Sequence, residues 1–171
     1  MSKLKSNTFL IALLTLAASC SKSSDAQHAA LPKSDLPEKF HLASAPSNAK
    51  PVGAVRSDAK QGDTVALAGR AKDFIDGLAV FTVTDETLKP CNEAGPMDTC
   101  PTPWDYCCDD PTDVAQKTVT VEFREGAEPM KKTVHGFHGL DHLSRVVVTG
   151  KAEKDAAGNL TVLADGVYVK P

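Results

Sequence analysis

The sequence predicts an all-β fold, a small five-stranded Greek-key barrel with a short helical insert between its third and fourth strands. Two observations carry this prediction. Apolar residues alternate with polar or small residues in five short segments, which is the period of a strand with one buried face. Turn signals containing glycine and aspartate separate several of these segments.

The first two predicted strands lie on either side of "DFIDG". "DTVALAGRAK" alternates from Val65 onward, and Gly69 interrupts the run where a strongly bent strand or a bulge favours glycine. Asp76 and Gly77 form the turn signal that ends this strand. "LAVFTVTD" is then the second strand.

Three more strands complete the predicted barrel. "KTVTVEFRE" has the cleanest alternation, with Val119, Val121 and Phe123 on one face. "SRVVVTGKAEK" and "LTVLADGVYV" are the fourth and fifth strands, joined by the turn "DAAGN". Between the third and the fourth, Leu140 and Leu143 in "HGFHGLDHLS" favour one short helical turn.

This layout is that of an OB-fold, a partly open Greek-key barrel. The sequence resembles bacterial OB domains of the tRNA-anticodon-binding-like kind in "TVALAGRA", in "AVFTVTDE" with its terminal Asp, and in "VVVTGKA" followed by "GNLTVLADGVYV". The resemblance covers nearly all of 61–171 and implies an OB-like barrel. The chain is also similar to uncharacterised bacterial lipoproteins that carry the loop "CPTPWDYCC", and these imply no ligand.

The N-terminus is typical of an exported protein. Lys3 and Lys5 precede an uncharged apolar run that is too short to span a bilayer as a permanent helix, which favours a secretory signal peptide over 1–19. The ending "AASC" resembles a bacterial lipobox. It implies a lipidated Cys20 that anchors the chain in the bilayer, with Ser21 after it implying the outer membrane and the periplasm. The alternative is a soluble export signal cut near Ala18.

We expect a lipidated Cys20 and a disordered tether over 20–60, followed by the OB-like domain over 61–171. The tether region is rich in Ala, Ser, Pro and Lys and has no sustained period, so it is not expected to bury enough apolar surface to fold. From Lys60 onward, 12 Lys and Arg stand against 18 Asp and Glu, a net charge of −6.

Nucleic acid is an unlikely partner for this domain. OB-folds that bind oligonucleotides or oligosaccharides use strands two and three, and single-stranded nucleic acid needs a basic groove with exposed aromatic platforms. This domain is acidic, and its strand aromatics Phe81, Phe123 and Tyr168 alternate as core residues do. Nucleic acid or oligosaccharide binding is therefore retained only by analogy with the fold.

The most unusual feature is a cysteine-rich segment between the second and third strands. In an oxidising compartment, an even number of cysteines in a small domain favours disulfides. We expect two, with pairing left open, among Cys91, Cys100, Cys107 and Cys108. Trp104 and Tyr106 would cover the sulfur atoms and form a binding rim.

A metal centre is the alternative for the same segment. Thiolates suit Zn or Cu, and three histidines follow the third strand closely. The candidate ligands are Cys91, Cys100, Cys107, Cys108, His135, His138 and His142. Otherwise we expect no cofactor. The adjacent cysteines lack the usual spacing of zinc ligands, and the nearby aspartates lack the spacing of a calcium loop.

The sequence contains no signature of a catalytic site, so an enzyme is not expected. We expect a cell-envelope lipoprotein that presents a disulfide-stapled OB-like binding module. The bound species is left open between a small ligand and an envelope protein. The alternatives are a periplasmic module that binds or delivers metal through Cys and His, and a structural partner of an envelope protein.

Overall fold

The computed structural model describes residues 30–93 and 100–171. Five strands dominate it: β2 (Thr64–Phe74), β3 (Val80–Thr84), β4 (Thr118–Glu122), β7 (Arg145–Lys154) and β8 (Leu160–Val169). The shorter elements are η1 (Glu38–Phe40), β1 (Lys50–Pro51), α1 (Val52–Asp58), η2 (Cys91–Glu93), α2 (Pro111–Gln116), β5 (Arg124–Glu125), β6 (Glu128–Pro129) and η3 (Phe137–Gly139).

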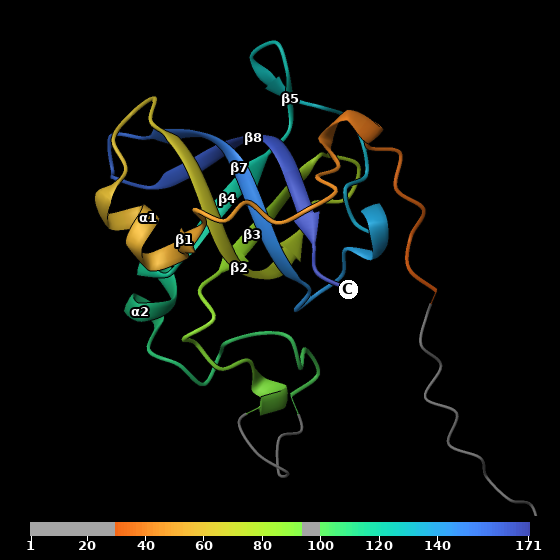
Figure 1. Ribbon diagram of the computed structural model, residues 1–171. Coiled ribbons are helices and arrows are strands. Elements are labelled where there is room, and N and C mark those ends of the chain that lie inside the picture. The colour runs from red at the N-terminus through yellow and green to blue at the C-terminus, as the bar shows by residue number, and fades with distance from the viewer. Residues whose placement is uncertain (1–29, 94–99) are drawn as a thin grey trace, which may run out of the picture.

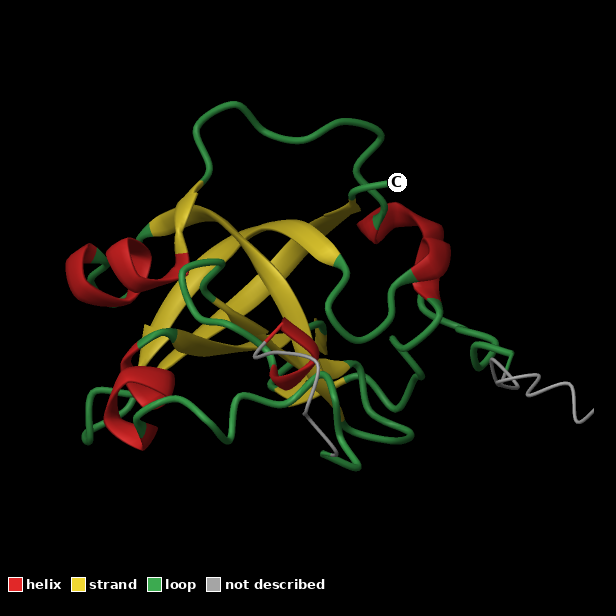
Figure 2. Ribbon diagram, turned by 90° about the horizontal axis from the view of Figure 1, so that it is seen from below, coloured by secondary structure: helices red, strands yellow, loops and turns green. Residues whose placement is uncertain are grey.

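The five strands close into a barrel in the order β2-β3-β4-β8-β7, with β7 pairing back onto β2. The closing pair is antiparallel and runs without a break from Thr64↔Lys151 to Arg70↔Arg145. Only β4 and β8 are parallel within the barrel. This order confirms the predicted all-β, OB-like barrel, and Figure 2 shows the strands at the centre of the molecule with loops and short helices around them.

The predicted alternation gives the barrel its core. Val119, Val121 and Phe123 are all buried, as are Phe81 and Val83 on the neighbouring strand. The helical insert is a single 3-10 turn, η3, and Leu140 directly after it is fully buried. These side chains form one continuous apolar cluster inside the barrel.

Gly69 is required for close packing and not for a bulge. The β2–β7 register is continuous through Gly69. A Cβ atom at this position would lie 2.5 Å from the Thr84 carbonyl oxygen and 2.8 Å from Val52 Cγ2. Glycine therefore allows α1 and β3 to approach β2 closely.

The predicted tether is wrong in its C-terminal part. Leu36, Phe40, Val52 and Val55 are buried in the core, and β1 pairs in parallel with β2. In Figure 1 this segment, in orange, crosses the face of the barrel before it enters α1. Its few apolar residues are irregularly spaced because the chain is mostly extended without regular structure, so no period reveals them.

The folded domain therefore begins well before residue 61. The predicted signal peptide and the lipidation site, Cys20, lie outside the described residues. Within the part of the chain that the structure describes, no helix is long and apolar enough to cross a membrane.

The Asp that ends the second predicted strand has a structural role. Asp85 is 4% exposed, and its carboxylate accepts hydrogen bonds from the backbone N–H groups of Gly53 (2.8 Å) and Thr87 (3.0 Å). Burial alone would raise the pKa of Asp85, but these hydrogen bonds outweigh it and the pKa is lowered. Asp85 thereby ties the first turn of α1 to the barrel.

Candidate functional site

The cysteine loop, residues 85–117, connects β3 to β4. In Figure 1 it lies in green at the end of the barrel opposite to the β5–β6 hairpin. In the described part of the loop, the regular elements are η2 and α2. Asp110 caps α2 by accepting hydrogen bonds from the backbone N–H groups of Thr112 and Asp113, and Pro111 occupies the first turn.

Two basic side chains of β2 hold the loop against the barrel. Arg70 forms an ion pair with Glu93 at 2.5 Å, and the Arg70 side chain is only 11% exposed. Lys72 pairs with Asp105 at 3.1 Å and with its neighbour Asp73 at 2.6 Å. Because both basic side chains are largely buried, these pairs are shielded from water more than ordinary surface ion pairs are.

The thiols of the loop converge. Cys91 Sγ lies 3.2 Å from Cys107 Sγ, which in turn lies 3.8 Å from Cys100 Sγ. The three sulfur atoms all lie within 4.8 Å of one another. Hydrogen bonds with the Cys91 and Cys100 thiols raise the pKa of Cys107 to about 12, and the Cys108 thiol contributes weakly.

The sulfur separations of 3.2 and 3.8 Å among the described cysteines exceed the bond length of a disulfide, about 2.05 Å. The predicted disulfides therefore stay a prediction. The structure does bring Cys91 and Cys107 together although fifteen residues separate them, and it leaves Cys107 and Cys108 exposed.

The two aromatic residues of the predicted rim occupy different positions. Trp104 is half-buried and stacks on the His142 ring, with ring centres 4.3 Å apart. Tyr106 is only 2% exposed, and its hydroxyl group has no hydrogen-bond partner in the described part of the chain. Burial raises the pKa of Tyr106 to about 12. Tyr106 is thus an interior residue of the loop, as Leu88 also is.

Within the described residues, the candidate cysteine and histidine ligands gather in separate groups and not in one set. Two of the histidines, His135 and His142, lie together with Asp141. The third, His138, lies apart from them, with its Nε2 atom 2.8 Å from a Glu38 carboxylate oxygen and its ring against that of His41. The sequence predicts one short helical turn for this segment. Instead, the backbone turns left-handed at His138 (φ 49°), which directs its side chain elsewhere.

A pocket of about 380 Å³ lies between the cysteine loop and the barrel. We call it the loop pocket. Its apolar wall comes from the loop and α2, and its charged residues come from β2 and the loop. The lining residues are Lys72, Asp73, Asp105, Tyr106, Cys107, Asp109, Pro111, Val114, Ala115 and Thr118.

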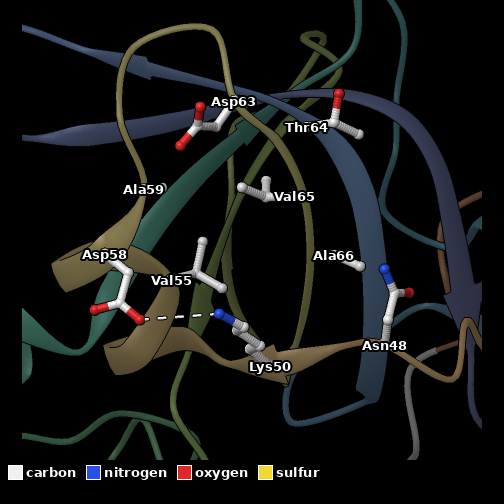
Figure 3. Close-up of a pocket in the computed structure, with 9 residues that line it drawn as sticks. All are labelled: Asn48, Lys50, Val55, Asp58, Ala59, Asp63, Thr64, Val65 and Ala66. Carbon is white, nitrogen blue, oxygen red and sulfur yellow. Dashed lines mark ion pairs between the residues drawn. The ribbon is translucent and has the colours of Figure 1, made fainter.

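A second hollow, of about 300 Å³, lies between α1 and the start of β2 (Figure 3). Its lining is mainly polar, and the dashed line in Figure 3 marks an ion pair of 3.9 Å between Lys50 and Asp58. Both side chains are more than 60% exposed. This hollow offers few apolar contacts, so the loop pocket is the better candidate for a ligand.

Several solved structures are similar to this chain, including the following two. The hypothetical protein ygiW from E. coli matches 74% of this chain and 96% of its own, with 11% sequence identity and a TM-score of 0.39. The OBody AM1L10, bound to hen egg-white lysozyme, matches 76% of this chain and 98% of its own, with 15% identity and a TM-score of 0.43. No protein-family model and no curated protein matches the chain.

Proposed function

We propose that the chain is an exported, lipid-anchored binding protein of the cell envelope that takes a small apolar ligand with a positive charge into the loop pocket. The observation that carries this proposal is the composition of the pocket. Val114, Ala115 and Pro111 line it, and its volume of about 380 Å³ is within the range of small-molecule sites.

The charge of the ligand follows from the pocket's ionisable residues. Three carboxylates, Asp73, Asp105 and Asp109, line the pocket with one ammonium group, that of Lys72. Lys72 is already paired with two of these carboxylates. The remaining negative potential favours a cationic group and opposes an anionic one.

The position of the pocket supports the same function. OB-folds commonly bind ligands across strands two and three. In this chain the cysteine loop connects those strands, β3 and β4, and the loop pocket includes Thr118 at the start of β4. The fold alone does not identify a ligand, so the chemistry of the lining residues defines the expected ligand.

Ligand-observed NMR with three matched probes tests this proposal. Benzylamine, benzyl alcohol and benzoate share one ring and differ in charge. We expect saturation transfer from the full-length protein to be largest for benzylamine and smallest for benzoate. Val114→Trp should abolish the signal by filling the pocket, and Asp109→Asn should narrow the difference between the probes. The proposal would be contradicted if the Val114→Trp variant gave the same saturation transfer as the wild type, or if the wild type preferred benzoate.

The lipid anchor has a separate test. The apolar run before "AASC" supports export, and Cys20 is the residue that would carry the acyl chains. Cys20→Ala should release the chain from the membrane fraction, because it removes the residue that would carry the acyl chains on which the anchor depends. If the Cys20→Ala variant stays in the membrane fraction, the proposed lipid anchor is wrong, and the proposal for the loop pocket is not affected.

In this proposal the cysteine loop is stapled by disulfides. The shortest sulfur separation, 3.2 Å, favours a Cys91–Cys107 pair. That pair leaves Cys100 with Cys108, and it avoids a strained bond between adjacent residues. The staple would hold Cys107 and Tyr106 in the wall of the loop pocket.

A thiolate metal centre is the second candidate, favoured by the mutual approach of three sulfur atoms within 4.8 Å. Four thiolates on one zinc ion lie about 3.8 Å apart, given a Zn–S bond of about 2.3 Å, and Cys100 and Cys107 have this separation. Metal analysis of the purified protein decides between the candidates. One equivalent of Zn or Cu together with four alkylatable thiols would support the metal centre and exclude the two disulfides.

A further inference from the structure

We propose that His135, Asp141 and His142 form a site for a divalent transition-metal ion, separate from the cysteine thiols. The donor atoms of the three side chains lie within 4.8 Å of one another, and all three residues are partly buried. They belong to the segment between β6 and β7. This inference goes beyond the proposed ligand pocket and does not depend on it.

The hydrogen bonds already orient the donor atoms. His142 Nδ1 contacts the backbone carbonyl of Lys72, and because a carbonyl only accepts, Nδ1 must carry the proton. The lone pair of His142 therefore lies on Nε2, which is the atom that would bind the ion in this proposal. A backbone carbonyl behind a ligating imidazole is the usual arrangement in metal sites, because it fixes the tautomer and the ring orientation.

The other two donors are also positioned. His135 Nε2 lies 2.8 Å from Asp141 Oδ1, so both atoms face the same space. The carboxylate only accepts, so His135 Nε2 carries the proton without an ion, and metal binding would release that proton to solvent or move it to Nδ1. The His135 ring stacks on Phe74, with ring centres 4.2 Å apart and nearly parallel planes. Asp141 Oδ1 also accepts a hydrogen bond from the His142 backbone N–H group at 2.7 Å. The three side chains are therefore already held in place, and an ion would lose little free energy in ordering them.

The spacing of the imidazole rings distinguishes this site from the group formed by Glu38, His41 and His138. With a Zn–N bond of about 2.0 Å, each ring centre lies about 3.2 Å from the ion, so two rings at a tetrahedral angle are about 5 Å apart. The centres of His135 and His142 are 5.4 Å apart. Those of His41 and His138 are 3.7 Å apart, which is closer than this geometry gives, although these two residues and Glu38 also offer donor atoms within 4.8 Å of one another.

Two imidazoles and one carboxylate suit Zn²⁺, Co²⁺ or Ni²⁺. The Asp141 side chain is 45% exposed, so water or an exogenous ligand has access to the remaining coordination positions. Trp104 of the cysteine loop stacks on His142. A bound ion would therefore also restrain the contact between the cysteine loop and the barrel.

Titration of the full-length protein with Co²⁺ tests the proposal, after alkylation of any free thiols. We expect one equivalent to bind with visible d–d absorption and without the near-ultraviolet thiolate band. Asp141→Asn keeps an oxygen that accepts both hydrogen bonds but loses the charge, and His135→Gln removes one imidazole. Each should weaken binding by at least about tenfold, which is the usual effect of disturbing a metal site.

His138→Gln is the matched control, because it removes the same kind of ring from the same segment but not from the site. It should leave Co²⁺ affinity unchanged. Thermal unfolding of the metal-free variants shows whether each is folded. No binding by the alkylated wild type, or an equal loss in His135→Gln and His138→Gln, would overturn the proposal. A Co²⁺ complex that shows the thiolate band before alkylation and is lost after it would assign the ion to the cysteines instead.

Discussion

The barrel and the cysteine loop are stabilised in different ways. The barrel combines a closed set of strand pairings with one apolar cluster. The described residues of the loop include two short helices, η2 and α2. The loop otherwise depends on individual contacts, namely the ion pairs of Arg70 and Lys72, the stacked Trp104, the buried Tyr106 and the thiols. A region with few regular hydrogen bonds opens locally at lower cost than a core does. The loop should therefore be able to open locally while the barrel stays folded.

The largest effect is expected in the barrel core. Phe81 is fully buried and packs against Phe74 and Phe123. Phe81→Ala should lower the free energy of unfolding by about 3–5 kcal/mol, because it removes apolar contacts and leaves a cavity. Denaturant unfolding measures this change. Ile75→Ala is the control, since Ile75 is 51% exposed and should change stability little. Similar losses in both variants would contradict this description of the core.

The next effect should be confined to the loop. If Cys91 and Cys107 are bonded, replacing both with Ser releases a loop of about 15 residues, worth about 3 kcal/mol in chain entropy. Hydrogen exchange of the loop amides should accelerate by about a hundredfold, while the β7 and β8 amides keep their rates. Equal acceleration in the barrel strands would show that the two regions unfold together.

Asp85 lies where the barrel meets the cysteine loop, and the stability that its carboxylate contributes should depend on pH. Asp85→Asn should cost about 1–2 kcal/mol at neutral pH, because the amide is a weaker acceptor for the N–H groups of Gly53 and Thr87. Since the folded pKa of Asp85 is lowered, its contribution is complete above the unfolded value of about 3.9 and is lost as pH falls through the folded pKa.

Unfolding curves of the wild type and of Asp85→Asn between pH 7 and pH 3 measure this contribution. The difference in stability should shrink on acidification, with the wild type losing stability faster. A difference that grows as pH falls would mean that Asp85 is protonated in the folded state.

The smallest effect is expected at the polar hollow of Figure 3. Lys50 and Asp58 lie 3.9 Å apart and are both exposed. Lys50→Ala should change the free energy of unfolding by less than about 0.5 kcal/mol, as is usual for exposed ion pairs. A loss above about 1 kcal/mol in thermal or denaturant unfolding would indicate a role for this hollow that its exposure does not suggest.

The same contrast explains what could be predicted from the sequence. The five strands were predictable because alternation reports a one-sided core directly, as in Val119 and Val121. The segment before residue 61 was missed because the burial of Leu36 and Phe40 depends on tertiary contacts and follows no period. Gly69 was recognised as special, but only the structure shows that it makes room for Val52.

The candidate site was less predictable, because it is assembled from distant residues. The sequence showed the cysteines and histidines, but not that Trp104 meets His142 or that His138 turns away. Lys72 and Asp141 were missed altogether. Lys72 occupies an otherwise ordinary strand position, and Asp141 acquires its meaning only beside His135. The loop pocket needs both the loop and the barrel, and no local pattern describes it.

The mass of the intact mature protein, measured under non-reducing conditions with and without alkylation, tests most directly whether the cysteine loop is a stapled wall of the loop pocket. We predict a mass lower by four hydrogens than that of the reduced chain, with no alkylated thiol among Cys91, Cys100, Cys107 and Cys108. Four alkylated thiols in protein taken from the envelope would contradict the staple.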